Sequence, residues 1–179
     1  LRLLPAYYFP VNDDLFQGSF GTAAVFDFML TPAIGFFAQG EYIGLGLENV
    51  DAIPLIDGSI GAGFSWNLHD RFSLRTDIQA GVYSVTAAGM GEDGEDSTQS
   101  GISAGARVSG AFHLSPMLTA SIYGGYRYFA RTFTEPFLNS FSVGVALTLN
   151  LKAAFNPRIN VSVQAAEQET VFPVLYSWY

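Results

Sequence analysis

A strict alternation of apolar and polar residues, with a period of two, limits the possible folds of this chain most. Residues 141–151 are the clearest case, because every second residue is a large apolar one and the residues between them are Ser, Gly, Ala, Thr and Asn. Successive side chains of a β-strand point to opposite faces, so this pattern predicts a strand with one apolar and one polar face. Four further segments have the same pattern, at residues 56–68, 72–84, 102–114 and 118–128.

Charged residues are scarce, and this bears on what the apolar faces contact. Only 13% of the 179 residues are charged, whereas about 25% is usual in a soluble protein. A surface in water needs more charge, so this surface is either covered or faces a solvent other than water. A bundle of membrane helices needs apolar runs of about 20 residues, and the sequence has none. The composition therefore favours a β-barrel with its apolar face toward lipid.

The number of strands and the lengths of the links predict an all-β, antiparallel up-and-down transmembrane β-barrel. We expect about ten strands, with eight as the alternative if a terminal segment does not cross. Short links at residues 31–32, 69–71 and 115–116 alternate with longer ones at 48–54, 87–100 and 130–139. Outer-membrane barrels have tight turns on the periplasmic side and longer loops outside. The expected strands are residues 3–10, 19–30, 34–47, 56–68, 72–84, 102–114, 118–128, 141–151, 159–165 and 171–179.

The whole chain, residues 1–179, is interpreted as one barrel domain. The sequence starts without an initiating Met, a basic region or a signal-peptide core, so we expect a mature segment or one excised from a longer chain. Strands 3–10 and 171–179 each contain a proline. Proline removes a hydrogen-bond donor and is avoided in central strands, so these two strands are predicted to be the neighbours that close the barrel.

Three segments carry a resemblance to a known family: IDGSIGAGFSWNL, SGISAGARVSGAFHL and NSFSVGVALTLNL. With them the chain resembles the small bacterial outer-membrane β-barrel proteins of eight to ten strands, the OmpA/OmpX-like superfamily. The resemblance implies insertion into a Gram-negative outer membrane, with both chain ends periplasmic and the long loops extracellular. It implies the lipid bilayer as the main partner and leaves room for periplasmic or extracellular protein partners. It does not imply one activity, because this architecture hosts adhesins, enzymes, pores and anchors.

Charged residues on the polar faces form the first candidate site. Buried charges must be paired or hydrated, so they are interpreted either as a salt-bridged plug, which we favour because the barrel is narrow, or as a polar track for ions and small solutes. Inward glycines at positions 61, 63, 81, 105 and 144 would leave space or relieve crowding. The predicted lumen charge network consists of Asp27, Glu41, Asp57, Arg75, Asp77, Arg107 and Arg127.

A second candidate is an acidic loop whose oxygen atoms suit Ca²⁺. It lacks the EF-hand pattern, so an acidic, Gly-rich extracellular loop is the favoured interpretation and no metal site is predicted. Its carboxylates are Glu92, Asp93, Glu95 and Asp96.

No catalytic site and no cofactor are predicted. Enzymes that resemble this barrel keep a catalytic histidine near the extracellular rim, whereas His69 and His113 lie at short turns, and the chain has no cysteine. The net charge of −8 argues against binding to nucleic acid, whose phosphates repel acidic surfaces.

The favoured function is therefore that of an integral outer-membrane barrel with a plugged polar lumen and a structural, membrane-anchoring or surface-interaction role. The first alternative is a narrow pore for ions or small solutes. The second is a soluble, lipocalin-like ligand-binding barrel that turns its apolar faces inward. That arrangement would leave a surface of Ser, Gly, Thr and Asn with few Lys or Glu, which is a poor surface for solubility.

Overall fold

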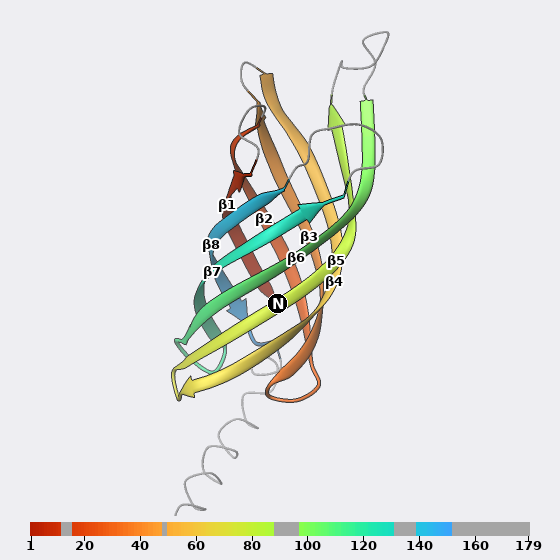
Figure 1. Ribbon diagram of the computed structural model, residues 1–179. Helices are drawn as coiled ribbons and strands as arrows, with labels where there is room; N and C mark the ends of the chain where they lie inside the picture. Colours follow the sequence, from red (N-terminus) through yellow and green to blue (C-terminus); the bar gives the residue numbers. More distant parts are fainter. Residues whose placement is uncertain (12–15, 48–49, 88–96, 131–138, 152–179) are drawn as a thin grey trace, which may run out of the picture.

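The protein is a closed barrel of eight antiparallel strands (Figure 1). The computed structural model describes residues 1–11, 16–47, 50–87, 97–130 and 139–151. Within these residues, no helix is long and apolar enough to cross a membrane. Each strand pairs with its neighbours in chain order. The strands are β1 (Arg2–Pro10), β2 (Phe16–Met29), β3 (Ile34–Leu47), β4 (Val50–His69), β5 (Phe72–Ala87), β6 (Ser97–His113), β7 (Leu118–Phe129) and β8 (Ser140–Leu149).

The ladder between β1 and β8 closes the barrel with eight strands, the smaller of the two expected numbers. It runs from Arg2 opposite Thr148 to Pro10 opposite Ser140. Strand 3–10 is a closing strand as predicted, but the prediction that 171–179 is its partner is wrong, because β8 already occupies that edge. The ladder register skips Leu4 and Pro5, which fits the missing donor of proline. The expected strands 159–165 and 171–179 lie outside the described residues.

The links separate into two ends of the barrel, as Figure 1 shows. Residues 30–33, 70–71 and 114–117 connect strands at one end, which we call the short-turn end. The other strand ends lie at the opposite end, which we call the long-link end; they are Pro10, Phe16, Leu47, Val50, Ala87, Ser97, Phe129 and Ser140. The predicted long link 48–54 is wrong, because β4 begins at Val50 and Leu47 pairs with Val50. Pro54 does not end the strand because it pairs with Gly44 of β3, while the ladder to β5 begins only at the next residue.

Large apolar side chains on the outward face of all eight strands are exposed. Ile60 of β4 is 71% exposed and Ile122 of β7 is 69% exposed. In β8 the alternating apolar residues point outward, with Val145 56% exposed. An apolar band around a whole protein far exceeds the few hundred Å² usual on a soluble monomer. The soluble, lipocalin-like alternative is therefore wrong, since it requires these side chains to point inward.

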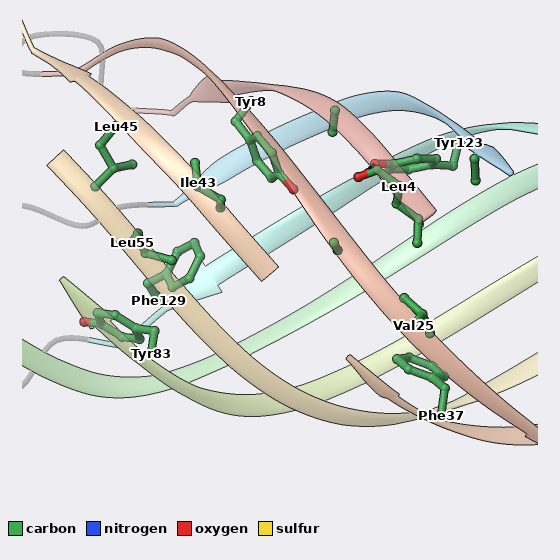
Figure 2. Close-up of a cluster of buried hydrophobic side chains, with 13 residues drawn as sticks. Leu4, Tyr8, Val25, Phe37, Ile43, Leu45, Leu55, Tyr83, Tyr123 and Phe129 are labelled. Atoms are coloured by element: carbon green, nitrogen blue, oxygen red, sulfur yellow. Dashed lines mark hydrogen bonds between the residues drawn. The ribbon is translucent and has the colours of Figure 1, made fainter. Parts of the chain in front are cut away.

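Buried side chains fill the barrel interior, and part of this interior is apolar (Figure 2). Leu45, Leu55, Tyr83 and Phe129 lie together near the long-link end, and the rings of Tyr83 and Phe129 meet edge to face with 5.2 Å between centroids. The Tyr83 hydroxyl also donates to the carbonyl of Ala130, at 3.0 Å. The interior is thus not polar throughout, because apolar side chains pack against one another near its long-link end.

Candidate functional site: the ion-pair network in the barrel

Asp77 of β5 is the centre of the first group of interior charges. It is 2% exposed and accepts bonds from guanidinium groups on three strands. Arg2 Nη1 lies 2.9 Å from Oδ2, Arg75 Nε lies 2.6 Å from Oδ1, and Arg107 Nη2 lies 2.9 Å from Oδ2. Arg2 is on β1, across the barrel from β5, so these contacts can form only through the interior.

Asp27 of β2 extends this group toward the short-turn end. Arg2 binds it with two parallel bonds, from Nε to Oδ2 at 2.8 Å and from Nη2 to Oδ1 at 2.9 Å. Arg75 Nη2 adds a third bond to Oδ1 at 2.8 Å. Two-bond arginine–carboxylate pairs are both strong and specific in geometry. We call this group the Asp77 cluster; it consists of Arg2, Asp27, Arg75, Asp77 and Arg107.

Arg127 of β7 holds a second group, nearer the long-link end. Its Nη2 lies 3.0 Å from Glu41 Oε2 and 2.5 Å from Asp57 Oδ1. Each of these two carboxylates also accepts a hydrogen bond from a neutral hydroxyl: Tyr8 donates to Glu41, and Ser103 donates to Asp57. We call this group the Arg127 cluster; it consists of Tyr8, Glu41, Asp57, Ser103 and Arg127.

Gln39 of β3 connects the two clusters. Arg107 Nη1 donates to Gln39 Oε1 at 3.2 Å, and Gln39 Nε2 donates to Glu41 Oε2 at 3.3 Å. Across both clusters the four guanidinium groups match the four carboxylates in charge. The structure thus brings all seven predicted network residues into ion pairs and adds Arg2, which the sequence analysis did not include.

Aromatic rings pack against three of the arginines. The Phe37 ring lies 5.5 Å from the Arg2 guanidinium carbon and 5.8 Å from that of Arg107. Arg107 also lies 5.7 Å from the Tyr123 ring, and Arg127 lies 5.5 Å from the Phe129 ring. A cation over a ring face gains about 0.5–2 kcal/mol, the larger value when the pair is away from water. The network is therefore packed against rings as well as paired in charge.

The inward glycines make room for these side chains. A Cβ at Gly63 would collide with the side chains of Asp77 and Arg75, and one at Gly105 would approach Arg127 Cδ to 2.8 Å. At the other three inward glycines, an added Cβ would meet Phe37, Ser59 or Tyr123 together with neighbouring backbone. Of the two roles considered for these glycines, the geometry favours relief of crowding, because other side chains use the space.

Two cavities lie on either side of the Asp77 cluster. The larger, of about 1210 Å³, opens at the short-turn end and is lined by Arg2 and Arg75 among others; we call it the short-turn cavity. The smaller, of about 20 Å³, lies between the two clusters and is lined by Gln79, Arg107 and Arg127. That volume is about enough for one water molecule. Arg127 Nε and Nη1 and Gln79 Oε1 have no hydrogen-bond partner among the described residues, and a water molecule in this cavity would be placed to bridge them.

The histidines and acidic residues do not assemble a catalytic or metal site within the described residues. His113 borders the short-turn cavity, and its ring nitrogens contact Ser73 Oγ at 3.2 Å and Thr119 Oγ1 at 2.9 Å. No group of three or more metal-ligating side chains occurs in the described part of the chain. The acidic loop with Glu92, Asp93, Glu95 and Asp96 lies outside the described residues.

The barrel is similar in fold to several solved structures of outer-membrane proteins. Neisserial surface protein A superposes with a TM-score of 0.67 at 10% identity, covering 83% of this chain and 92% of that one. The chain has the fold of a small outer-membrane β-barrel. Ail, the attachment invasion locus protein of Yersinia pestis, gives a TM-score of 0.52 at 16% identity and covers 82% and 94% of the two chains. The outer membrane enzyme PagL gives 0.53 at 7% identity and covers 84% and 99%.

No protein-family profile matches the sequence, and no curated protein matches it either. The superposition on Neisserial surface protein A confirms the expected resemblance to small outer-membrane barrels at the level of the fold. The barrel has eight strands, the smaller of the two expected numbers.

Proposed function

We propose that this protein is an integral barrel of a Gram-negative outer membrane, with a closed lumen and a structural, membrane-anchoring or surface-interaction role. The exposed apolar band on all eight strands supports membrane insertion, because only lipid makes such a surface favourable. The likeness to outer-membrane barrels supports the same location. The name of Ail, an attachment invasion locus protein, agrees with a role in surface interaction.

The paired charges across the lumen are the observation that carries the proposal of a closed barrel. An eight-stranded barrel is just wide enough to be filled by side chains, and here two clusters and their aromatic neighbours occupy successive levels. A solute would have to separate buried ion pairs, and breaking such a pair by removing one partner costs about 3–5 kcal/mol. We infer that this barrier prevents steady conduction.

Conductance in planar bilayers tests closure. The full chain should give no reproducible current steps, because the two clusters block the lumen in series. A matched variant, Arg107→Ala with Arg127→Ala, removes one guanidinium from each cluster and should give steps. Regular steps from the unmodified protein would contradict a closed lumen and favour the alternative of a narrow pore.

The narrow pore keeps one specific observation in its favour. The short-turn cavity opens to one end of the barrel, and the charged clusters begin at its inner wall. If the clusters exchange partners fast enough to pass ions, the current should depend on the sign of the ion, because the Asp77 cluster has one guanidinium in excess and the Arg127 cluster has one carboxylate in excess. Ion selectivity measured with asymmetric salt would then identify the pore.

We also propose the orientation, with the short-turn end and the residues at positions 1 and 151 in the periplasm. The support is the asymmetry of link lengths, which in outer-membrane barrels places tight turns inside. The chain has no cysteine, so single-cysteine labelling reports each site alone. On intact cells a membrane-impermeant maleimide should label Gly94→Cys, and it should label Asp70→Cys only after the outer membrane is permeabilised. The reverse result would invert the orientation.

A role without catalysis is part of the same proposal. Its support is that His113 contacts only hydroxyls among the described residues, with no carboxylate to orient the ring for proton transfer. PagL is named as an enzyme, so the fold itself does not decide the point. Ester hydrolysis by the refolded protein that is lost in Ser73→Ala would overturn this part.

A further inference from the structure

The charges within the Asp77 cluster do not balance. Three guanidinium groups, of Arg2, Arg75 and Arg107, face two carboxylates. The opposite excess is in the Arg127 cluster, where one guanidinium faces two carboxylates, and Gln39 lies between them. An uncompensated charge in a protein interior is costly unless water or a counter-ion reaches it. The Arg127 cluster offsets part of the excess positive charge, and a negative group on the open side of the Asp77 cluster would offset more of it.

The open side of the Asp77 cluster is the short-turn cavity. Arg2 and Arg75 form part of its wall. Within the described residues, the hydrogen-bond partner of Arg75 Nη1 is the sulfur of Met29, at 3.9 Å, and a thioether is a weak acceptor. Arg71 of the neighbouring turn also lines the cavity. The cavity therefore presents guanidinium donors to which no oxygen of the described residues is bonded.

The other polar groups of the cavity favour an anion over a cation. Both oxygens of Asp27 are occupied by guanidinium groups, so this carboxylate is not free to bind a cation. Asp70 is the other carboxylate in the lining and lies in an exposed turn. Ser65 and Ser121 add hydroxyls to the lining, and hydroxyls can donate to an anion without adding charge.

We propose that the short-turn cavity binds a phosphate group, with Arg75 as its main ligand and Arg71 as a second. Guanidinium groups bind phosphate through charge-assisted bonds that match its geometry. The cavity volume of about 1210 Å³ is larger than a free ion needs and leaves room for an attached body. The phosphate can be carried by a soluble molecule or by a lipid headgroup. The site is independent of whether the lumen conducts.

Isothermal titration calorimetry on the refolded full chain tests this site. The protein is held in dodecyl maltoside, which contains no phosphate and no charge, at an ionic strength fixed with sodium chloride. Inorganic phosphate is the first probe, and dihexanoylphosphatidic acid below its micelle concentration is the second. The variants are Arg75→Gln and Arg71→Gln, and the matched control is Arg127→Gln, which makes the same change in the other cluster.

We expect saturable binding at one site per chain. Arg75→Gln should weaken it by about tenfold, the loss of one charge-assisted bond, and Arg71→Gln should weaken it less. Arg127 does not line the short-turn cavity, so Arg127→Gln should weaken binding much less than Arg75→Gln does. Tighter binding of the free ion indicates a soluble ligand, and tighter binding of the phosphatidic acid indicates a lipid headgroup; either result supports the site.

Absence of saturable binding for both probes would overturn the proposal, and so would an equal loss in Arg127→Gln and Arg75→Gln. Arg71 is in an exposed turn and makes no ion pair within the described residues, so Arg71→Gln tests the site even if Arg75→Gln fails to fold. Phosphate affinity unchanged in Arg71→Gln would in that case overturn it.

Discussion

Replacing Ile60 by arginine tests which face of the barrel contacts lipid. Ile60 lies in the middle of β4, points outward and is 71% exposed. It pairs with Ala38 on one side and Ala80 on the other, so the arginine would have small neighbours and no carboxylate opposite it. At the centre of a bilayer, an arginine on the lipid face of a barrel costs about 2–4 kcal/mol.

The expected loss corresponds to a folding equilibrium constant lower by roughly 30- to 900-fold. The measurement is reversible urea unfolding in lipid vesicles, followed by tryptophan fluorescence. Leu68→Arg is the matched control, because Leu68 lies on the same strand and face, is 62% exposed, and is next to the short turn. An arginine near the membrane interface costs only about 0–1 kcal/mol.

The difference between the two positions carries the conclusion. If Ile60 faced water, its replacement by arginine would change stability by no more than about 0.5 kcal/mol, and Leu68→Arg would behave alike. Equal effects at the two positions would refute the assignment of the apolar face to the membrane interior.

Two further substitutions test the interior. Asp77→Asn should lower the free energy of unfolding by about 3–5 kcal/mol, because three arginines lose a buried carboxylate. The control, Asp70→Asn in the exposed turn, should change this free energy little. Equal losses for the two variants, measured by unfolding in vesicles, would contradict the Asp77 cluster. Gly63→Ala should cost about 1–3 kcal/mol, because its Cβ would displace Asp77 and Arg75. The control is Gly40→Ala, because no atom lies within 4 Å of its added Cβ; it should leave the free energy of unfolding unchanged or raise it by about 0.4–1 kcal/mol. Equal costs for the two glycine variants in the same assay would argue against a crowded lumen.

The direction of the side chains could be predicted from sequence because alternation is a local property. In β8 the exposed residues Phe141, Val143 and Val145 are those that the two-residue period assigns to the apolar face. The number of strands could not be predicted in the same way, because closure depends on the ladder between β1 and β8, which joins the two ends of the barrel. Alternation alone gives no information on which strands meet.

The sequence indicated seven of the eight charged residues of the candidate site, but not Arg2 or the neutral side chains that bond to them. Arg2 was overlooked because the expected strand began at residue 3, although extending the alternation by one residue would place Arg2 on the same face as Leu4 and Tyr8. Gln39 and Ser103 were not predicted, because their roles depend on contacts across the barrel. Neutral residues on a polar face carry no local signal for such contacts.

The apolar end of the interior was also missed. Leu45 and Leu55 are buried with Phe129 near the long-link end, where the sequence suggested a link around Pro54. A proline usually indicates a turn or the edge of a sheet, but here the strand continues because Pro54 has a partner on one side only. The continued strand brings Leu55 into the barrel, where it is buried among other apolar side chains.

The dependence of folding on an amphiphile tests the central claim most directly. The purified chain would be diluted from urea into plain buffer or into lipid vesicles, and its β-sheet circular dichroism and heat-modifiable gel mobility would be measured. The exposed apolar band predicts that both signals develop only with vesicles or detergent micelles. A stable, monomeric β-structure in plain buffer would contradict the membrane barrel.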